Sequence, residues 1–279
     1  PERLLTDRFL RLLGPTRIQY RNHRKIVIAD GKEAWIGGLN VGDEYMGRSR
    51  KFGPWRDTHV HLRGPAVLAA DLSFREDWQW ATGEELNGLP ASTAIAGDQS
   101  VLVMPTGPAD VLESCAIAFD DVIGQSRERL WIVSPYFVPD TSMETALYAA
   151  AMRGVDVRIL IPEKPDHIIV WLASIAHAFR MITHGIAVYR YPEGFLHQKV
   201  ILVDDRIAGV GTVNFDNRSF RINFEITMWF THERMVDDVE KMLHKDFADA
   251  VKVDLQKPGA RPRVVLRFIS EAARLFSPI

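Results

Sequence analysis

One long pattern occurs twice in this chain. Residues 23–40 read HRKIVIADGKEAWIGGLN and residues 197–214 read HQKVILVDDRIAGVGTVN, and the two align without a gap. This repeat constrains the fold more than any other sequence feature, because it predicts two similar structural units in one chain. The identical positions are His23/His197, Lys25/Lys199, Asp30/Asp204, Ala34/Ala208, Gly37/Gly211 and Asn40/Asn214.

Each copy has the composition of a β-hairpin. A β-branched run, a polar turn and a second apolar run follow one another in both copies. Side chains two residues apart on a strand share a face, so the histidine and the lysine of each copy point the same way. The return strand brings the asparagine back beside the histidine. Gly37 and Gly211 leave the neighbouring surface bare, whereas Asp30 and Asp204 fall in the turns and are interpreted as structural.

A phosphate group suits this set of side chains. Lysine supplies positive charge, asparagine supplies N–H donors, and histidine can attack or transfer a proton. Two unrelated hairpins with coincident residues are the alternative, and the matched spacing argues against it. The candidate phosphate ligands are Lys25, Asn40, Lys199 and Asn214, and the candidate catalytic residues in the repeats are His23, His197, Lys25 and Lys199.

Two carboxylates are candidates for orienting the histidines. Asp57 follows the first copy of the repeat within the stretch WRDTH, and Glu225 follows the second copy on the next expected strand. A carboxylate that accepts the Nδ1 proton of an imidazole orients the ring and stabilises its charged form. We therefore expect Asp57 and Glu225 to act with the two histidines.

The composition is that of a globular protein without a metal or disulfide framework. The 279 residues carry a formal net charge of −2, but residues 1–63 hold 13 Lys or Arg against 7 Asp or Glu, which fits an anionic substrate or surface. Cys115 is the only cysteine, so no internal disulfide can form and a reducing compartment is expected. His59 and His61 share a strand face but have no third ligand at suitable spacing, so we expect no metal.

The order of elements around the second copy predicts an α/β fold. Strands at 130–138, 155–161 and 186–191 alternate with helices at 142–153 and 167–184, the pattern of a parallel or mixed sheet with crossover helices. The first copy, by contrast, begins at position 23, too early for an equivalent set of elements to precede it. This difference suggests the hypothesis that the first unit lacks its N-terminal elements.

Four further segments are interpreted from their composition. Residues 109–129 have helical periodicity, and residues 82–100 are rich in small polar residues typical of a linker. The helix expected at 167–184 is apolar almost all round, which indicates either a core helix or a surface for acyl chains or a membrane. The basic amphipathic tail, 256–279, fits an anionic bilayer or the protein's own surface equally well.

The spacing HxK, four residues, Asp, six residues, G-x-x-N resembles the motif of the phospholipase D superfamily and is complete in both copies. Within it, the stretches WRDTHVHLRG, SPYFVPD and NFDNRSFRINFE look like those of bacterial cardiolipin synthases. Gly38 and Thr212 stand where the superfamily often has serine. The resemblance implies two phospholipase D-like lobes, each a β-sheet flanked by helices, related by a pseudo-twofold axis with the active site between them. The expected division is a first lobe at 1–95, a second at 96–255 and a C-terminal helix at 256–279.

The resemblance also implies a chemistry. One histidine attacks the phosphodiester to give a phosphatidyl-histidine, and the other protonates the leaving alcohol; by analogy His23 is the nucleophile and His197 the acid and base. A cardiolipin synthase makes cardiolipin and glycerol from two phosphatidylglycerols, without a cofactor. We expect a bacterial membrane-associated catalytic part on the cytoplasmic side, with an anionic membrane surface as partner.

Two other enzyme classes use the same residues. A hydrolytic phospholipase D would use water as the acceptor. A nuclease of the superfamily would act on nucleic acid, but the net charge of −2 and the apolar helix argue against it. A catalytically inactive scaffold is the third alternative, and the two complete motifs argue against that.

Overall fold

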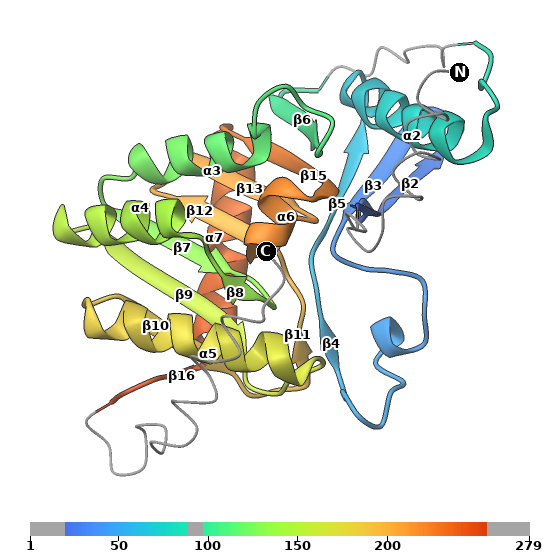
Figure 1. Ribbon diagram of the computed structural model, residues 1–279. Helices are drawn as coiled ribbons and strands as arrows, with labels where there is room; N and C mark the ends of the chain where they lie inside the picture. Colours follow the sequence, from blue (N-terminus) through green and yellow to red (C-terminus); the bar gives the residue numbers. More distant parts are fainter. Residues whose placement is uncertain (1–19, 89–96, 256–279) are drawn as a thin grey trace, which may run out of the picture.

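The computed structural model describes residues 20–88 and 97–255 (Figure 1). It is a mixed α/β fold, as the sequence predicts. The strands are β1 (Arg21–Asn22), β2 (Ile26–Ala29), β3 (Glu33–Gly37), β4 (Trp55–Arg56), β5 (His59–Arg63), β6 (Val101–Thr106), β7 (Arg129–Val133), β8 (Phe137–Val138), β9 (Asp156–Pro162), β10 (Ala187–Tyr191), β11 (Phe195–Leu196), β12 (Val200–Val203), β13 (Ile207–Gly211), β14 (Phe215–Asp216), β15 (Asn223–Phe230) and β16 (Val251–Lys252). The helices are η1 (Glu44–Met46), α2 (Ala66–Thr82), α3 (Ser114–Gly124), α4 (Thr141–Met152), α5 (Ile168–Thr183), α6 (Asn217–Arg221) and α7 (Glu233–Ala248).

A large mixed sheet forms the centre of the fold. Among the described residues its strand order is β1-β15-β13-β12-β7-β9-β10-β16, and β6 also pairs with β15. β7, β9 and β10 run parallel, joined by the crossover helices α4 and α5. The predicted alternation of strands and helices is therefore confirmed. Two boundaries differ: the strand expected at 130–138 is divided into β7 and β8, and the helix expected at 109–129 is the shorter α3.

Both copies of the repeat fold as hairpins with the same register. Ile26 pairs with Ile36 in the first copy, and the equivalent Val200 pairs with Val210 in the second. A third antiparallel strand then joins each hairpin, β5 beside β3 and β15 beside β13, and a helix follows each of them. The hairpin, strand and helix thus form a unit that occurs twice.

Two apolar clusters cover the two faces of the central sheet. One lies under α3, α4 and α5, in front of the sheet in Figure 1, and the other lies under α7 behind it. The second cluster also contains Ala34, Ile36, Val60 and Leu62 of the small sheet β2-β3-β5, together with Val67 of α2. The two halves of the chain therefore share one core.

Short parallel strands exchange between the halves. Arg21 and Asn22 of β1 pair with Asn223 and Phe224 of β15. In the opposite direction, β11 of the second half pairs with β4 of the first. Both β1 and β11 end immediately before a motif histidine, so these pairings bring the histidines to the junction between the halves.

Two expectations concern segments that the structure does not describe. The boundary expected between residues 95 and 96 and the expected C-terminal helix at 256–279 lie outside the described residues. Within the described ranges, none of the helices combines the length and the hydropathy that crossing a bilayer requires.

The two turn aspartates adopt the same backbone conformation but differ in their contacts. Asp30 and Asp204 have φ of 54° and 53°, the left-handed region that aspartate and asparagine tolerate better than most residues. Asp30 is exposed. The buried Asp204 carboxylate accepts backbone N–H bonds from Arg127 (3.2 Å), Glu128 (2.8 Å) and Arg129 (3.0 Å). Burial opposes the charge, but these bonds lower the pKa of Asp204 below its usual value.

Replacing Asp204 with asparagine should destabilise the fold. Asparagine keeps the backbone conformation but loses the charge and turns an N–H group toward N–H donors, so we expect a loss of about 2 kcal/mol in the free energy of unfolding. Urea unfolding at neutral pH measures it, with Asp30→Asn as the matched control, expected within about 0.5 kcal/mol of the parent. Because the folded pKa is lowered, this contribution is present above the unfolded pKa of about 3.9 and is lost as pH falls through the folded value. Equal losses in both variants would contradict this role.

Candidate active site

The first motif histidine is bonded to a carboxylate of the other half. His23 follows β1, and its Nδ1 lies 2.8 Å from Oε2 and 3.0 Å from Oε1 of Glu225. The Glu225 side chain is fully buried, whereas 26% of the His23 side chain is exposed. Burial would raise the pKa of Glu225, but His23, Thr212 and Asn223 together lower it below its ordinary value. An ionised carboxylate only accepts hydrogen bonds, so Nδ1–H of His23 donates and Nε2 is left for chemistry.

The second motif histidine has the reciprocal arrangement. Nδ1 of His197 lies 2.8 Å from Oδ2 of Asp57, which belongs to the first half. Burial would raise the pKa of Asp57, but His197 and Lys199 lower it. The equivalent glycines of the two hairpins, Gly37 and Gly211, pair with His59 and Thr227 on the third strand of each unit. Asp57 precedes His59 by two residues and Glu225 precedes Thr227 by two residues, so the two carboxylates occupy equivalent positions. Each orienting carboxylate therefore serves the histidine of the opposite unit.

Backbone hydrogen bonds repeat this crossed pattern. The N–H of His23 donates to the carbonyl of Phe224 at 2.9 Å, and the N–H of His197 donates to the carbonyl of Arg56 at 2.8 Å. Both acceptors immediately precede an orienting carboxylate. The two units thus make equivalent contacts with one another, which is consistent with the pseudo-twofold relation expected from the sequence.

The two motif lysines immediately precede β2 and β12; Lys199 is buried and Lys25 is partly buried. Nζ of Lys25 donates to the carbonyl of His23 at 2.7 Å, and Nζ of Lys199 donates to that of His197 at 2.6 Å. Burial lowers the pKa of Lys25 to about 8 against the opposing charges of Glu225 and Asp57. Burial and the charge of Lys25 lower the pKa of Lys199 to about 7. A bound anion would offset both effects, so the site is arranged to receive negative charge.

His197 is more deeply buried than His23. Only 9% of its side chain is exposed. The rings of Trp55, Phe195 and Tyr45 lie 5.1, 5.9 and 6.3 Å from its ring. Burial, followed by the charge of Lys199, lowers the pKa of His197 to about 4, although Asp57 raises it. The ring is therefore neutral near pH 7 before an anion binds.

The two carboxylates are accommodated by different neighbours. The Thr212 hydroxyl donates to Oε2 of Glu225 at 2.6 Å and accepts the backbone N–H of Ile226 at 3.0 Å. The equivalent position is Gly38, where a Cβ would stand 2.1 Å from Oδ1 of Asp57. Thr212 thus holds an orienting carboxylate, and Gly38 leaves room for the other.

The two motif asparagines occupy unlike surroundings. Asn214 is buried and lines a cavity of about 320 Å³ together with His23. Asn40 is exposed, and its Nδ2 donates to the Tyr45 hydroxyl at 2.7 Å. The structure therefore places Asn214 with His23, and Asn40 with an aromatic residue that faces His197.

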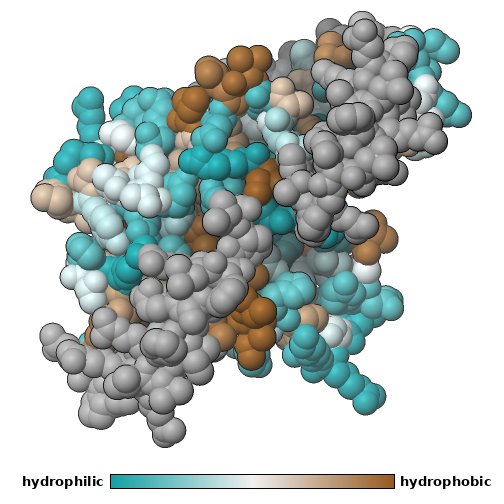
Figure 2. All heavy atoms as spheres, viewed as in Figure 1, coloured by the Kyte–Doolittle hydropathy of each residue, from teal (hydrophilic) through white to brown (hydrophobic). Residues whose placement is uncertain are grey.

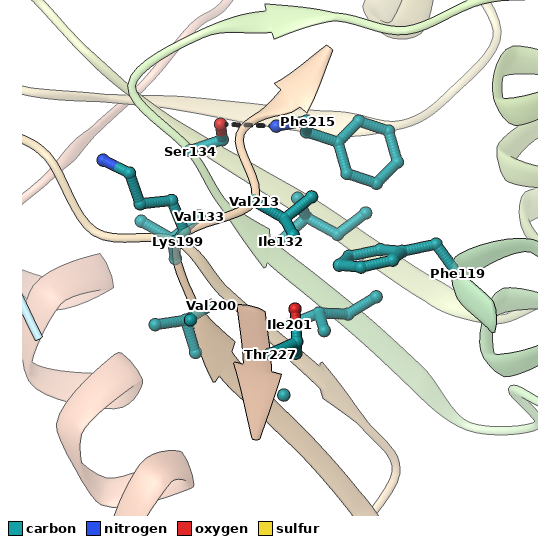
Figure 3. A pocket seen from close by; sticks show the side chains of 12 residues that line it. Phe119, Ile132, Val133, Ser134, Lys199, Val200, Ile201, Val213, Phe215 and Thr227 are labelled. Carbon is teal, nitrogen blue, oxygen red and sulfur yellow. Dashed lines mark hydrogen bonds between the residues drawn. The ribbon is translucent and has the colours of Figure 1, made fainter. Parts of the chain in front are cut away.

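The region between Lys199 and the aromatic rings of Phe119 and Phe215 has no room for a ligand. Figure 3 shows the Lys199 side chain running away from Phe119 and Phe215, which line a void of about 10 Å³. That volume is close to the least that one water needs. Ligand space therefore lies on the histidine side of the strand.

The two histidines of β5 each have a protein contact. Nδ1 of His59 lies 3.4 Å from the backbone N of Leu39. His61 bonds Glu33 at 2.7 Å and stacks on Trp35 at 4.6 Å. Across the described residues, no three His, Cys, Asp or Glu side chains are grouped as metal ligands.

Comparison with known proteins gives the family. The family described as "Cardiolipin synthase, PLD-like domain" matches residues 119–247. Cardiolipin synthase A of Pseudomonas putida (strain GB-1) is 46% identical over 265 residues, covering 94% of this chain and 55% of the relative. Cardiolipin synthase A of Pseudomonas fluorescens (strain SBW25) is 46% identical over 268 residues, covering 96% and 56%. The chain belongs to the phospholipase D superfamily.

One solved structure has a similar fold. Phosphatidylserine synthase of Haemophilus influenzae Rd KW20 superposes with a TM-score of 0.68 at 16% identity, over 93% of this chain and 70% of that one. The chain spans about half the length of the curated relatives it matches.

Several contacts of the two histidine–carboxylate pairs were not assigned from the sequence. Thr212, noted only as a departure from the usual serine, and Asn223 bond the Glu225 carboxylate. Tyr45 of η1 and Trp55 of β4 face His197. Their aromatic character within a largely polar stretch of sequence was the available signal.

Adding a methyl group at Gly38 should disrupt the Asp57–His197 pair. A Cβ at 2.1 Å from Oδ1 must displace a buried carboxylate, so we expect Gly38→Ala to cost about 1–3 kcal/mol in the free energy of unfolding. Chemical denaturation measures the loss, and the Nδ1 proton resonance of His197 reports the hydrogen bond directly. Gly97→Ala is the matched control, because no atom of the described residues lies within 4 Å of a Cβ there. An unchanged resonance in Gly38→Ala would rule out this positioning effect.

Proposed function

We propose that this protein is a phosphatidyltransferase of the cardiolipin synthase type. The observation that carries the proposal is the pair of crossed hydrogen bonds, His23 to Glu225 and His197 to Asp57, beside the buried Lys199 and the partly buried Lys25. The arrangement supplies a nucleophile, an acid and base, and charge for a phosphodiester. The high identity to cardiolipin synthases supports phosphatidylglycerol as donor and acceptor and association with a bacterial membrane.

In the first step, Nε2 of His23 attacks the phosphorus of phosphatidylglycerol. The new N–P bond forms as the bond from phosphorus to the glycerol oxygen breaks, and His197 gives its Nε2 proton to that oxygen, so glycerol leaves. Glu225 stabilises the positive charge that develops on His23. Lys25, Lys199 and the two motif asparagines hold the non-bridging oxygens.

The acid role of His197 depends on the substrate. Before substrate binds, burial and the two lysines lower its pKa. A phosphodiester bound between the lysines offsets their charge and raises the pKa of His197, so that the ring takes up the proton that the leaving glycerol needs.

In the second step, a free hydroxyl of another phosphatidylglycerol loses its proton to neutral His197. Its oxygen forms a bond to phosphorus as the N–P bond to His23 breaks. The products are cardiolipin and the enzyme with His197 protonated, and the ring releases this proton to water when the anionic product leaves, which restores the starting enzyme. The same residues with water as acceptor give phosphatidic acid, so the products decide between transfer and hydrolysis.

Removing either histidine should abolish turnover. His23→Ala and His197→Ala should each lose at least about 10²–10⁴-fold, because each removes a nucleophile or a proton-transfer group. The assay is mass spectrometry of lipid products from phosphatidylglycerol vesicles, where cardiolipin and glycerol are expected. Peptide mapping of acid-sensitive adducts would locate the phosphatidyl group on His23.

His61→Ala is the matched control, since its ring bonds Glu33 at the turn end of the β2–β3 hairpin and is bonded to neither motif histidine. It should stay within about two-fold of the parent. A chelator should leave the rate unchanged. Near-normal cardiolipin formation in either motif variant would refute the paired-histidine mechanism, and phosphatidic acid as the main product would identify a hydrolase.

Substrate affinity should fall as pH rises through 7 to 8. The pKa of Lys199 is lowered to about 7 and that of Lys25 to about 8, so the substrate-free site loses its positive charge across this range. We expect KM for a short-chain phosphatidylglycerol to rise roughly ten-fold between about pH 7 and 9. The phosphodiester stays ionised throughout, so the change reports the protein. A flat KM would show that the lysines do not bind the phosphate.

A further inference from the structure

The helix α5 has two parts with different surroundings. Residues 173–178 are buried and Ala178 and Met181 pack in the core. Its first turn is different: Ile168 is 65% exposed and Ile169 is 54% exposed. The sequence indicated two interpretations of this segment, a core helix and an apolar surface. The middle of α5 is a core helix, and its first turn is an exposed apolar surface.

This first turn borders the cavity that contains His23. Val170, one residue beyond Ile169, lines that cavity of about 320 Å³ together with Val138. Val170 therefore connects the lining of the His23 cavity with the two exposed isoleucines that precede it on α5. Within the described part of the chain, no protein element covers Ile168 and Ile169, so both side chains face outward.

The same cavity has a basic rim. Arg21 and Arg218 line it beside His23 and Asn214. Arg221, at the end of α6, pairs with Glu113 and Asp140. Arginines at the mouth of an apolar wall match a lipid that has an anionic headgroup and apolar chains.

A second exposed apolar pair lies on the same face. Val111 is 100% exposed and Leu112 is 66% exposed, in the loop before α3. Helix α6 separates this loop from the His23 cavity, because its residues line the pockets on both sides. Figure 2 shows apolar areas near the start of α3 and near the start of α5 on one face of the molecule.

We propose that the first turn of α5 enters an anionic bilayer and guides acyl chains out of the active-site cavity. The proposal rests on the function proposed above. A diacyl phospholipid whose phosphate reaches His23 must keep its chains out of water, so the surface adjoining His23 has to meet the bilayer interface. The Ile168–Ile169 pair supplies the apolar contact, and Arg21 and Arg218 attract the anionic headgroups.

The test uses the double variant Ile168→Glu/Ile169→Glu. Glutamate is favourable at the start of a helix, so the fold should be kept, and thermal unfolding checks this. We expect binding to vesicles of about 30 mol% phosphatidylglycerol in phosphatidylcholine to fall roughly ten-fold or more. Turnover on those vesicles should fall with it. Turnover of a water-soluble short-chain phosphatidylglycerol should stay within about two-fold.

Met152→Glu/Val251→Glu is the matched control. It adds the same charge at two exposed apolar residues, at the end of α4 and in β16, at the edge of the fold away from the first half (Figure 1). Its vesicle binding should equal that of the parent. The uncharged pair Ile168→Gln/Ile169→Gln, expected to lose vesicle binding to a smaller degree, replaces the glutamate variant if that variant fails to fold.

Each outcome decides the proposal. Vesicle binding by the α5 variants equal to the parent, or an equal loss in the control, would overturn it. Loss of self-association rather than of vesicle binding, measured by sedimentation without lipid, would assign the surface to a second copy instead. Failure of the parent on short-chain lipid would refute the proposed function, whereas the vesicle-binding comparison would still test the surface.

Discussion

The crossed hydrogen bonds between histidine and carboxylate are the interaction on which the site depends. His23 is oriented by Glu225 and His197 by Asp57, so neither unit contains a complete catalytic pair. Desolvated carboxylates are stable here only because each has an imidazole and further donors. The exchanged strands β1 and β4 set this geometry by fixing the backbone before His23 and before Asp57. The site is therefore complete only when the two halves pack against each other.

The same burial that fixes the site also determines its charge. Lowered pKa values at Lys25, Lys199 and His197 share one leading cause, the removal of water. An anion that enters restores the charge that burial opposes, which makes the site receptive to phosphate. Beside it, the first turn of α5 gives the cavity an apolar side. A charged reaction centre next to an apolar wall matches the two ends of a phospholipid.

The two hairpins and their motif residues could be predicted from the sequence, because the aligned repeat gives the same strand register in both copies. Equal spacing from His23 to Asn40 and from His197 to Asn214 predicted two hairpins, and β2-β3 and β12-β13 confirm them. The partner of each carboxylate could not be predicted. It depends on β1 pairing with β15 from the far end of the chain, and such short strands leave no periodicity in the sequence. The aromatic residues around His197 were missed for a similar reason, since Tyr45 lies in the three-residue helix η1 and Trp55 in the two-residue strand β4.

The crossed arrangement resembles what an isologous dimer makes, where every contact occurs twice by symmetry. In such a dimer a substitution on one side is imposed on the other. Here both copies belong to one polypeptide, so each can change alone. Gly38 with Asp57 and Thr212 with Glu225 illustrate this freedom: one copy has a shorter acid and no side chain beside it, and the other a longer acid held by a hydroxyl. Joining the copies thus allows two chemically equivalent histidines to acquire separate duties.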